Sequence, residues 1–333
     1  DLMAWSFSRK ATTTPGQKTQ KTAVQLQREA AIVLALGGGF QAYFKQQRDG
    51  SIYDEEMPVM AEVAKFCRER QALSHHSEAV PQIAVLFSKD DTYRRSNSLF
   101  GRNLARVRGI LEPLLEHQQS VEVLGEHQLT GRLASYPLIV IPECDTLAPA
   151  FRDELAAYAR AGGNLLLVGP GSAKLFEHEL GIALQGNLSA TTAFQLMHGA
   201  TKVALTGRAQ NVTLANATRT FGELRPTKSP DAPAQPAASI TSVGRGRIAA
   251  VYFTAGQIYA KDHPPALRDF LNTLARELFP QPLVEVKGSR DVDVVTARNH
   301  GKLLVHLVNT SGDHATAPVL ETVAPLGPLA ITI

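Results

Sequence analysis

The stretch AGGNLLLVGPGS, residues 161–172, indicates the fold class of this 333-residue chain. Its apolar run from Asn164 to Val168 has the length of a buried strand. Gly162 and Gly163 stop the amphipathic helix that we predict from Ala148 to Ala161, and Gly169-Pro170-Gly171-Ser172 makes a turn after the strand. A helix, a glycine stop, a buried strand and a glycine-rich turn in this order are typical of a parallel sheet with crossover helices.

The same pattern repeats on both sides of this stretch. Before it we predict strands Ile83–Phe87, Val121–Leu124 and Leu138–Pro142 and a helix over Ser98–His117. After it we predict short antiparallel strands within Gly186–Thr218, a loop over Arg225–Ala238, a hairpin over Ile240–Phe253 that turns at Gly244-Arg245-Gly246, and a closing helix over Pro265–Leu278. Residues 81–280 are therefore expected to form a doubly wound α/β domain of the flavodoxin-like class.

Two shorter segments flank this domain. The first 80 residues contain two strand-then-helix units, predicted as strand Asp1–Ser8, helix Lys21–Leu36, strand Phe40–Phe44 and helix Tyr53–Leu73. Two such units cannot close a sheet by themselves. Residues 281–333 have β alternation over Leu283–Lys287, Val292–Arg298, Lys302–Asn309 and a final run, so we expect a small β-sandwich. Because the chain starts in one strand and stops in another, we expect a fragment truncated at both ends.

The composition excludes several classes of partner and site. The 34 basic and 31 acidic residues are mixed along the chain, so neither nucleic acid nor a membrane surface is an expected partner. Cys67 and Cys144 are far apart and are expected to be two buried small apolar side chains, and His75-His76 has no acidic or cysteine company. His306 lies in an alternating strand and is expected to be a hydrogen-bonded sheet residue. We therefore expect no metal and no cofactor.

The turn at Gly169–Ser172 lies where a nucleophile elbow would be. The domain resembles class I glutamine amidotransferases, whose elbow carries a cysteine that a distant His and an acidic residue activate. This turn has no cysteine, and the elbow spacing around Ser172 is broken by Lys174. Cys144 follows a different strand, and His263 beside two prolines is expected to be a surface or capping residue. The resemblance therefore implies the fold without the catalytic residues.

A second resemblance places this domain in a larger protein. AGGNLLL at 161–167 and GRGRI at 244–248, before the closing helix, resemble the trimerisation domain of family 42 β-galactosidases. In that family, and in related glycoside hydrolases with α-amylase-like or fucosidase-like barrels, such a domain follows a TIM barrel and precedes a small β domain. The resemblance implies that residues 1–80 are the C-terminal remnant of the barrel, with its strands seven and eight, that 81–280 are the amidotransferase-like domain, and that 281–333 are a truncated β-sandwich.

The barrel resemblance also implies a binding site. TIM-barrel active sites lie at the C-terminal ends of the strands, which points to Trp5, Tyr43, Arg48 and Asp49 as substrate-binding residues. Trp5 either stacks on a sugar ring or belongs to a core, and Asp49 either binds sugar hydroxyls or organises a turn and caps the next helix. Family 42 enzymes carry a nucleophilic glutamate on strand seven, and Asp1–Ser8 contains none. The catalytic pair is therefore unknown and is expected upstream.

The sequence thus predicts the non-catalytic C-terminal region of a glycoside hydrolase, inactive alone, whose α/β domain serves packing or oligomerisation. The resemblance implies a carbohydrate as substrate of the parent enzyme, copies of the chain as partners, and a bacterial periplasmic or secreted location. The first alternative is a stand-alone oligomerisation or scaffold module. The second, with the least support from the residues, is an amidotransferase-like amidase.

Overall fold

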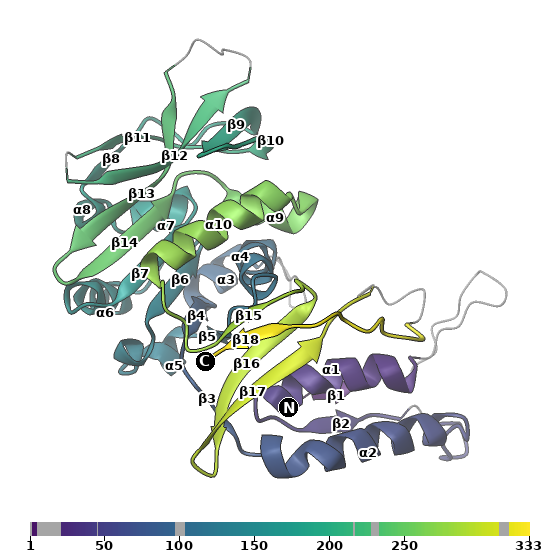
Figure 1. Cartoon of the computed structure of the whole chain (residues 1–333). Helices are drawn as coiled ribbons and strands as arrows, with labels where there is room; N and C mark the ends of the chain where they lie inside the picture. Colours follow the sequence, from purple (N-terminus) through teal and green to yellow (C-terminus); the bar gives the residue numbers. More distant parts are fainter. Residues whose placement is uncertain are drawn as a thin grey trace. The chain divides into compact units, whose positions relative to one another are not determined.

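The computed structural model describes residues 2–4, 21–44, 46–96, 104–215, 217–227, 233–312 and 320–333. The chain divides into two compact units (Figure 1). Unit 1 comprises Asp1–Val80, Gln118–Ser120 and Val284–Ile333, and unit 2 comprises Pro81–His117 and Val121–Leu283. None of the helices in the described ranges combines the length and the apolar character that a membrane span requires.

Unit 2 is built on a nine-stranded sheet (Figure 1). Its strands are β4 (Ile83–Leu86), β5 (Val121–Leu124), β6 (Leu138–Pro142), β7 (Asn164–Val168), β9 (Thr192–His198), β10 (Thr201–Gly207), β12 (Arg219–Pro226), β13 (Gln235–Val243) and β14 (Gly246–Val251). Their order is β10-β9-β12-β13-β14-β7-β6-β4-β5, and β8 (Ile182–Gln185) pairs separately with β11 (Asn211–Leu214).

The parallel part of this sheet contains a topological switch point. Strands β14, β7, β6, β4 and β5 are parallel neighbours. The chain passes from β4 to β5 on one side of β4, and it then continues with β6 on the other side. In open α/β sheets, ligands bind at such a point, outside the carboxyl ends of the strands. The place to look for a site in unit 2 is therefore the end of β4 and β6.

Helices cover both faces of the unit 2 sheet (Figure 1). They are α3 (Lys89–Arg95), α4 (Ala105–Leu115), α5 (Glu126–Leu129), η1 (Leu133–Ser135), α6 (Pro149–Arg160), α7 (Pro170–Lys174), α8 (Glu177–Leu180), α9 (Ala255–Asp262) and α10 (Pro265–Leu278). Side chains alternate along β4, so Ile83 joins the cluster that contains Leu271 of α10, whereas Ala84 joins the cluster that contains Leu155 of α6. Each fully buried Leu or Ile contributes about 1.5–3 kcal/mol of burial free energy.

Several predicted elements of unit 2 agree with the structure. The predicted ranges of β5, β6, β7 and α10 match at both ends. The predicted loop over Arg225–Ala238 is wrong at its ends, because β12 runs to Pro226 and β13 begins at Gln235. Ala237 and Ala238 are fully buried, and β13 pairs with both β12 and β14. Burial of these small side chains in the sheet outweighs the local preference of an alanine-proline composition for a loop.

Unit 1 combines residues from both ends of the chain. Its elements are β1 (Leu2–Ala4), α1 (Ala23–Ala35), β2 (Phe40–Ala42), α2 (Glu56–Ser74), β3 (Glu78–Ala79), β15 (Glu285–Lys287), β16 (Val292–Asn299), β17 (Lys302–Asn309) and β18 (Ala330–Thr332). β1 and β2 pair in parallel, from Leu2 with Phe40 to Ala4 with Ala42, and α1 connects them. The rest of the predicted strand Asp1–Ser8 lies outside the described residues.

The late strands of unit 1 form two small sheets. One has the order β17-β16-β3. In it β3, which ends just before Val80, pairs with β16 from the C-terminal part of the chain. The other joins β15 and β18. Asn299-His300-Gly301 makes the turn between β16 and β17, with φ of 47° at His300 and 75° at Gly301. The division of the chain into residues 1–80, 81–280 and 281–333 stays a prediction.

Candidate functional site

The turn at Gly169–Ser172 contains a hydroxyl, that of Ser172, which forms hydrogen bonds within the protein. Gly169 begins it with a φ of 88°, and Ser172, on α7, is fully buried. The Ser172 Oγ donates to the Ile141 carbonyl at 3.2 Å and accepts from the Cys144 N–H at 2.8 Å. The hydroxyl thus ties α7 to the end of β6. A buried hydroxyl with these partners lacks the exposure that a nucleophile needs.

Cys144 has the environment of a structural thiol. Its side chain is 1% exposed, and its Sγ donates to the Thr146 carbonyl at 3.0 Å. Burial raises the pKa of the thiol to about 12. Because the thiolate is the reactive form, such a cysteine is inert at neutral pH. The other cysteine, Cys67 on α2, is only partly buried, so the expectation of two buried cysteines is correct for Cys144 alone.

His263 lies at the end of a helix, where it contacts Glu112 and Tyr259. It ends α9 in the left-handed conformation, with a φ of 46°. Its Nε2 lies 3.2 Å from the Glu112 carboxylate, and both side chains are partly exposed. This arrangement agrees with the expected surface or capping role.

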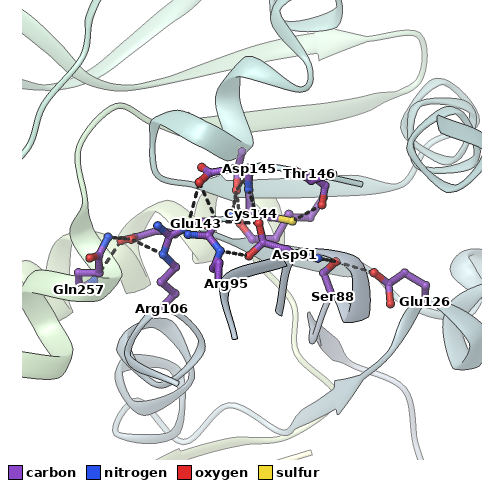
Figure 2. Close-up of polar contacts among 12 residues, drawn as sticks. Ser88, Asp91, Arg95, Arg106, Glu126, Glu143, Cys144, Asp145, Thr146 and Gln257 are labelled. Atoms are coloured by element: carbon purple, nitrogen blue, oxygen red, sulfur yellow. Dashed lines mark hydrogen bonds and ion pairs between the residues drawn. The ribbon is translucent and has the colours of Figure 1, made fainter. Parts of the chain in front are cut away.

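The carboxyl ends of β4 and β6 carry a network of charged and polar side chains (Figure 2). Arg95 Nε and Nη2 donate to the two carboxylate oxygens of Asp91, both at 2.6 Å, and Nη2 also donates to Asp145 at 2.7 Å. The Asp145 N–H donates to Asp91 at 2.8 Å. Arg106 donates to the Glu143 carbonyl and lies 3.4 Å from the Asp145 carboxylate. Two arginines and three acidic residues are therefore engaged with one another.

Glu143 anchors this network to α9. It follows β6 with a positive φ of 38°, a conformation that costs free energy in a residue with a Cβ, and it is 3% exposed. Its carboxylate accepts from the Gln257 N–H at 3.0 Å and from the Gln257 amide Nε2 at 2.5 Å. Burial raises the pKa of Glu143, although the Gln257 bonds and Arg106 act in the opposite direction. A Cβ on Gly169 would lie 2.6 Å from its Cγ, so the elbow glycine makes room for this side chain.

The network leaves little room for a ligand. The cavity at the ends of β4 and β6 has a volume of about 40 Å³, and its lining includes Ser88, Asp91, Arg95, Arg106 and Cys144. This volume suits one or two water molecules, whereas small-molecule sites are ~300–1,000 Å³. The switch-point crevice of unit 2 is thus filled by side chains of the chain itself.

The sequence held one signal for this network. Ser88-Lys89-Asp90-Asp91 has the spacing of a helix capping box, and Ser88 Oγ accepts from the Asp91 N–H at 3.2 Å at the start of α3. The Ser88 hydroxyl also donates to Glu126 at 2.6 Å. That signal predicts α3, which our sequence prediction lacked. It does not predict the partners of Asp91, since these come from another strand end.

The predicted sugar-binding residues lie partly outside the described structure. Trp5 is outside the described residues. Tyr43, Arg48 and Asp49 are exposed and belong to the segment between β2 and α2. Asp49 accepts from the Ser51 hydroxyl at 2.7 Å and from its N–H at 3.0 Å, and these bonds lower the pKa of the carboxyl. Asp49 therefore organises a turn, and it does not cap α2, whose N-cap residue is Glu55.

No metal site emerges from the part of the chain that the structure describes. Within the described ranges, no group of three or more His, Cys, Asp or Glu side chains is arranged to hold an ion. His75 and His76 contact each other, with ring centroids 3.8 Å apart. The Nε2 atom of His306 has no hydrogen-bond partner within the described residues, so the expectation of a hydrogen-bonded sheet histidine is wrong.

Comparison with solved structures shows what this chain is similar to. It superposes on α-L-fucosidase isoenzyme 2 from Paenibacillus thiaminolyticus with a TM-score of 0.76 at 14% identity, over 94% of this chain and 51% of that one. A catalytic mutant of a GH42 β-galactosidase from G. stearothermophilus gives 0.67 at 14% identity, over 90% and 46% of the two chains. The β-galactosidase from Rahnella sp. R3 gives 0.63 at 15% identity, over 86% and 46%.

These similarities concern the fold. The chain shares a glycoside hydrolase-like fold and spans about half the length of the enzymes it matches. Neither the family models nor the curated proteins gave a match to the sequence.

Proposed function

We propose that this chain is the C-terminal part of a TIM-barrel glycoside hydrolase, and that unit 2 serves packing or oligomerisation while the chemistry belongs to the barrel. The observation that carries the proposal is the filled switch point. The crevice where this kind of sheet binds ligands is about 40 Å³ and is occupied by the Asp91–Arg95–Asp145 contacts. Similarity in fold to an α-L-fucosidase and to β-galactosidases supplies the enzyme class.

Two features of the fold support the finer assignment. The five parallel strands of unit 2 follow the order 2-1-3-4-5 in chain sequence, which is the flavodoxin-like order and suits an amidotransferase-like, trimerisation-like domain. In unit 1, β1, α1, β2 and α2 follow one another as two β/α units with parallel strands, as the last units of a barrel would. Residues 281–333 would then form the start of a β-sandwich.

The substrate follows from the same proposal. A glycoside hydrolase acts on a carbohydrate, and Trp5, Tyr43, Arg48 and Asp49 would contribute to its site from the ends of the last two barrel strands. The catalytic carboxylate pair would come from earlier strands. Serine and cysteine chemistry is disfavoured, because Ser172 is fully buried and Cys144 is 1% exposed.

Activity measurements test the non-catalytic role. The purified 333-residue chain is incubated with a panel of aryl glycosides that includes β-galactosides and α-L-fucosides, and we expect no turnover. Turnover at an enzyme-like rate would contradict the proposal.

Light scattering tests the assembly role. We expect the chain to form a discrete oligomer whose mass is a multiple of 35.9 kDa. A strict monomer at high concentration would overturn the oligomerisation role and leave only packing within the parent. The coding sequence upstream of Asp1 tests the parent itself: about six further β/α units with two carboxylate residues at strand ends are expected.

A further inference from the structure

Strand β10 lies at one end of the nine-stranded sheet of unit 2 (Figure 1). Among the described residues its one strand neighbour is β9, from Thr201 opposite His198 to Gly207 opposite Thr192. An edge strand presents a row of backbone N–H and C=O groups with which another chain can pair. The seven residues of β10 are therefore a candidate interaction surface.

The turn between β9 and β10 determines which backbone groups point to the open edge. Two residues separate His198 from Thr201, and the first of them, Gly199, has a φ of 54°, which suits a two-residue hairpin turn. The residues that flank such a turn are hydrogen-bonded to each other, and hydrogen-bonded positions then alternate along the pair of strands. The odd-numbered residues of β10 therefore bond to β9. Its even-numbered residues direct their N–H and C=O groups to the edge: Lys202, Ala204 and Thr206.

The described structure leaves this edge uncovered. The side chains of Lys202, Ala204 and Thr206 are exposed, and within the described ranges the backbone hydrogen bonds outside helices and strand ladders involve none of the three. Natural edge strands are often protected by proline, by bulges or by charges that point inward. β10 contains no proline and has no bulge in its register with β9, and its single charged residue, Lys202, lies on the exposed face. The edge is therefore open to a partner strand.

The two faces of β10 differ in polarity. Leu205 is 5% exposed and belongs to the apolar cluster that contains Ile258 of α9 and Leu271 of α10. Val203 packs against the same cluster but stays partly exposed at the edge. The opposite face carries the exposed side chains of the even-numbered residues. A partner strand that fits must therefore continue an apolar layer on one face and a solvated layer on the other.

A second copy of β10 meets both requirements. In an antiparallel pair about a two-fold axis at Ala204, all seven residues of the strand have a residue opposite them. Val203 of one copy then lies opposite Leu205 of the other on the covered face, where the pair extends the apolar layer. Lys202 lies opposite Thr206 of the second copy on the exposed face, so like charges do not meet. The strand is thus complementary to itself.

Other registers fit less well. A slip by one residue would set the apolar positions of one copy opposite the solvated positions of the other. A two-fold axis at Lys202 would place two lysines directly opposite each other, which is destabilising. An axis at any other residue of β10 leaves part of the strand without a partner.

We propose that β10 pairs antiparallel with β10 of a second copy about a two-fold axis at Ala204, which joins two nine-stranded sheets into one. This inference rests on the assembly role proposed for unit 2 and names the surface that performs it. Backbone hydrogen bonds supply the attraction, and the side-chain pattern selects a copy of the same chain. A two-fold contact closes at two copies, so the expected mass is twice that of the 35.9 kDa chain.

Cross-linking tests the register. Lys202→Cys and Thr206→Cys are prepared separately in a Cys67→Ser chain, then mixed and treated with oxidised glutathione. Opposite residues of an antiparallel pair have Cα atoms about 4.5–5.5 Å apart, which is within reach of a disulfide. We expect a covalent dimer in the mixture and none in either variant alone, where four residues, or ~13 Å, separate the two thiols along the strands.

Thr220→Cys is the matched control for Thr206→Cys. Thr220 is also exposed, but it lies in β12, which pairs with β9 and β13 and offers no open edge. Its mixture with Lys202→Cys should give no covalent dimer. Absence of the dimer in the mixture of Lys202→Cys with Thr206→Cys would overturn the proposed pairing, as would equal amounts of dimer in each variant alone.

Ala204→Pro tests the edge by mass. The Ala204 N–H points away from β9, so a proline there leaves the β9–β10 bonds in place and blocks only an added strand. Light scattering should show the mass fall from two chains to one, with circular dichroism as the check that the variant is folded. An oligomer that persists in folded Ala204→Pro, or a trimer of the unchanged chain, would overturn this pairing and leave the assembly role intact. A strict monomer of the unchanged chain would overturn both.

Discussion

Two cavities of this chain place arginines in different surroundings. At the ends of β4 and β6, Arg95 and Arg106 face acidic residues within a volume of about 40 Å³. In unit 1, Arg70 borders a volume of about 500 Å³ and lies 3.7 Å from Glu69, and both of these side chains are about half exposed. The difference teaches that a cluster of charges at a favourable place in a fold is not a site by itself. What matters is whether the charges are held in buried pairs or stay in contact with solvent.

The surroundings have consequences for stability. A partly buried ion pair has lost much of its hydration, so removing one partner leaves the other uncompensated. An arginine that stays in contact with solvent keeps its water and contributes little to folding. Mutation of the unit 2 network should therefore cost more stability than mutation of an exposed arginine in unit 1.

The largest effect is expected from Asp91→Ala. Asp91 is 8% exposed and accepts two bonds from Arg95 and one from the Asp145 N–H. Removal of a partner from a buried pair costs about 3–5 kcal/mol, and because Arg95 keeps Asp145 we expect about 3 kcal/mol. Hydrogen exchange of the β6 peptides in increasing urea measures this loss in unit 2.

The matched variant in the other unit is Arg70→Met, which should cost less than about 1 kcal/mol in the exchange of α2. Similar losses in the two variants would remove the distinction between a buried network and an exposed arginine.

A smaller effect is expected from Gly169→Ala. Gly169 has a φ of 88° and a ψ of 156°, a region that residues with a Cβ rarely enter, and the new Cβ would lie 2.6 Å from the Glu143 Cγ. Backbone strain of this kind costs about 1–3 kcal/mol, so we expect about 2 kcal/mol from the same exchange measurement.

Gly131→Ala separates backbone strain from crowding. Gly131 also has a positive φ, 76°, but nothing lies within 4 Å of a Cβ built there, so its replacement should cost about 1 kcal/mol. If Gly131→Ala proved as costly as Gly169→Ala, the contact with Glu143 would play no part in shaping the elbow.

The sequence predicted the sheet of unit 2 far better than it predicted the site. β6 and β7 lie in the middle of a parallel sheet, so they are continuous apolar runs with Gly or Pro at their ends. Such runs are read directly from residue order. β13 is different, because Pro236, Ala237 and Ala238 have no strong local preference for a strand. Pro236 pairs with β12, and Ala238 pairs with both β12 and β14.

Local sequence patterns could not predict the network at the switch point, for a different reason. Asp91 and Asp145 are 54 residues apart and meet because β4 and β6 are neighbours in the sheet. The residues around Asp91 and Asp145 contain no local signal that β4 and β6 are neighbours. By contrast, residue types alone showed that the turn at Gly169–Ser172 lacks a cysteine and the elbow spacing. The structure adds that the buried Ser172 hydroxyl accepts a hydrogen bond from the Cys144 N–H.

The two cysteines provide a chemical comparison of the units that needs no mutation. Burial raises the pKa of both thiols, but Cys67 is only partly buried and the Arg70 charge acts to lower its pKa. Cys144 has a pKa of about 12, so only ~10⁻⁴ of it is thiolate at pH 8. We expect iodoacetamide to label native Cys67 well before Cys144, as followed by mass spectrometry of the two peptides.

The unfolded chain is the control for this labelling, because in urea the two cysteines lose their environments and should react at similar rates. Rapid labelling of Cys144 in the native chain would mean that the ends of β4 and β6 open to solvent and expose a thiolate. That outcome would contradict a sealed switch point, and it would restore the amidase alternative as a hypothesis to be tested with a glutamine analogue. Fast labelling of Cys67 with slow labelling of Cys144 would show that the accessible thiol is the one in unit 1.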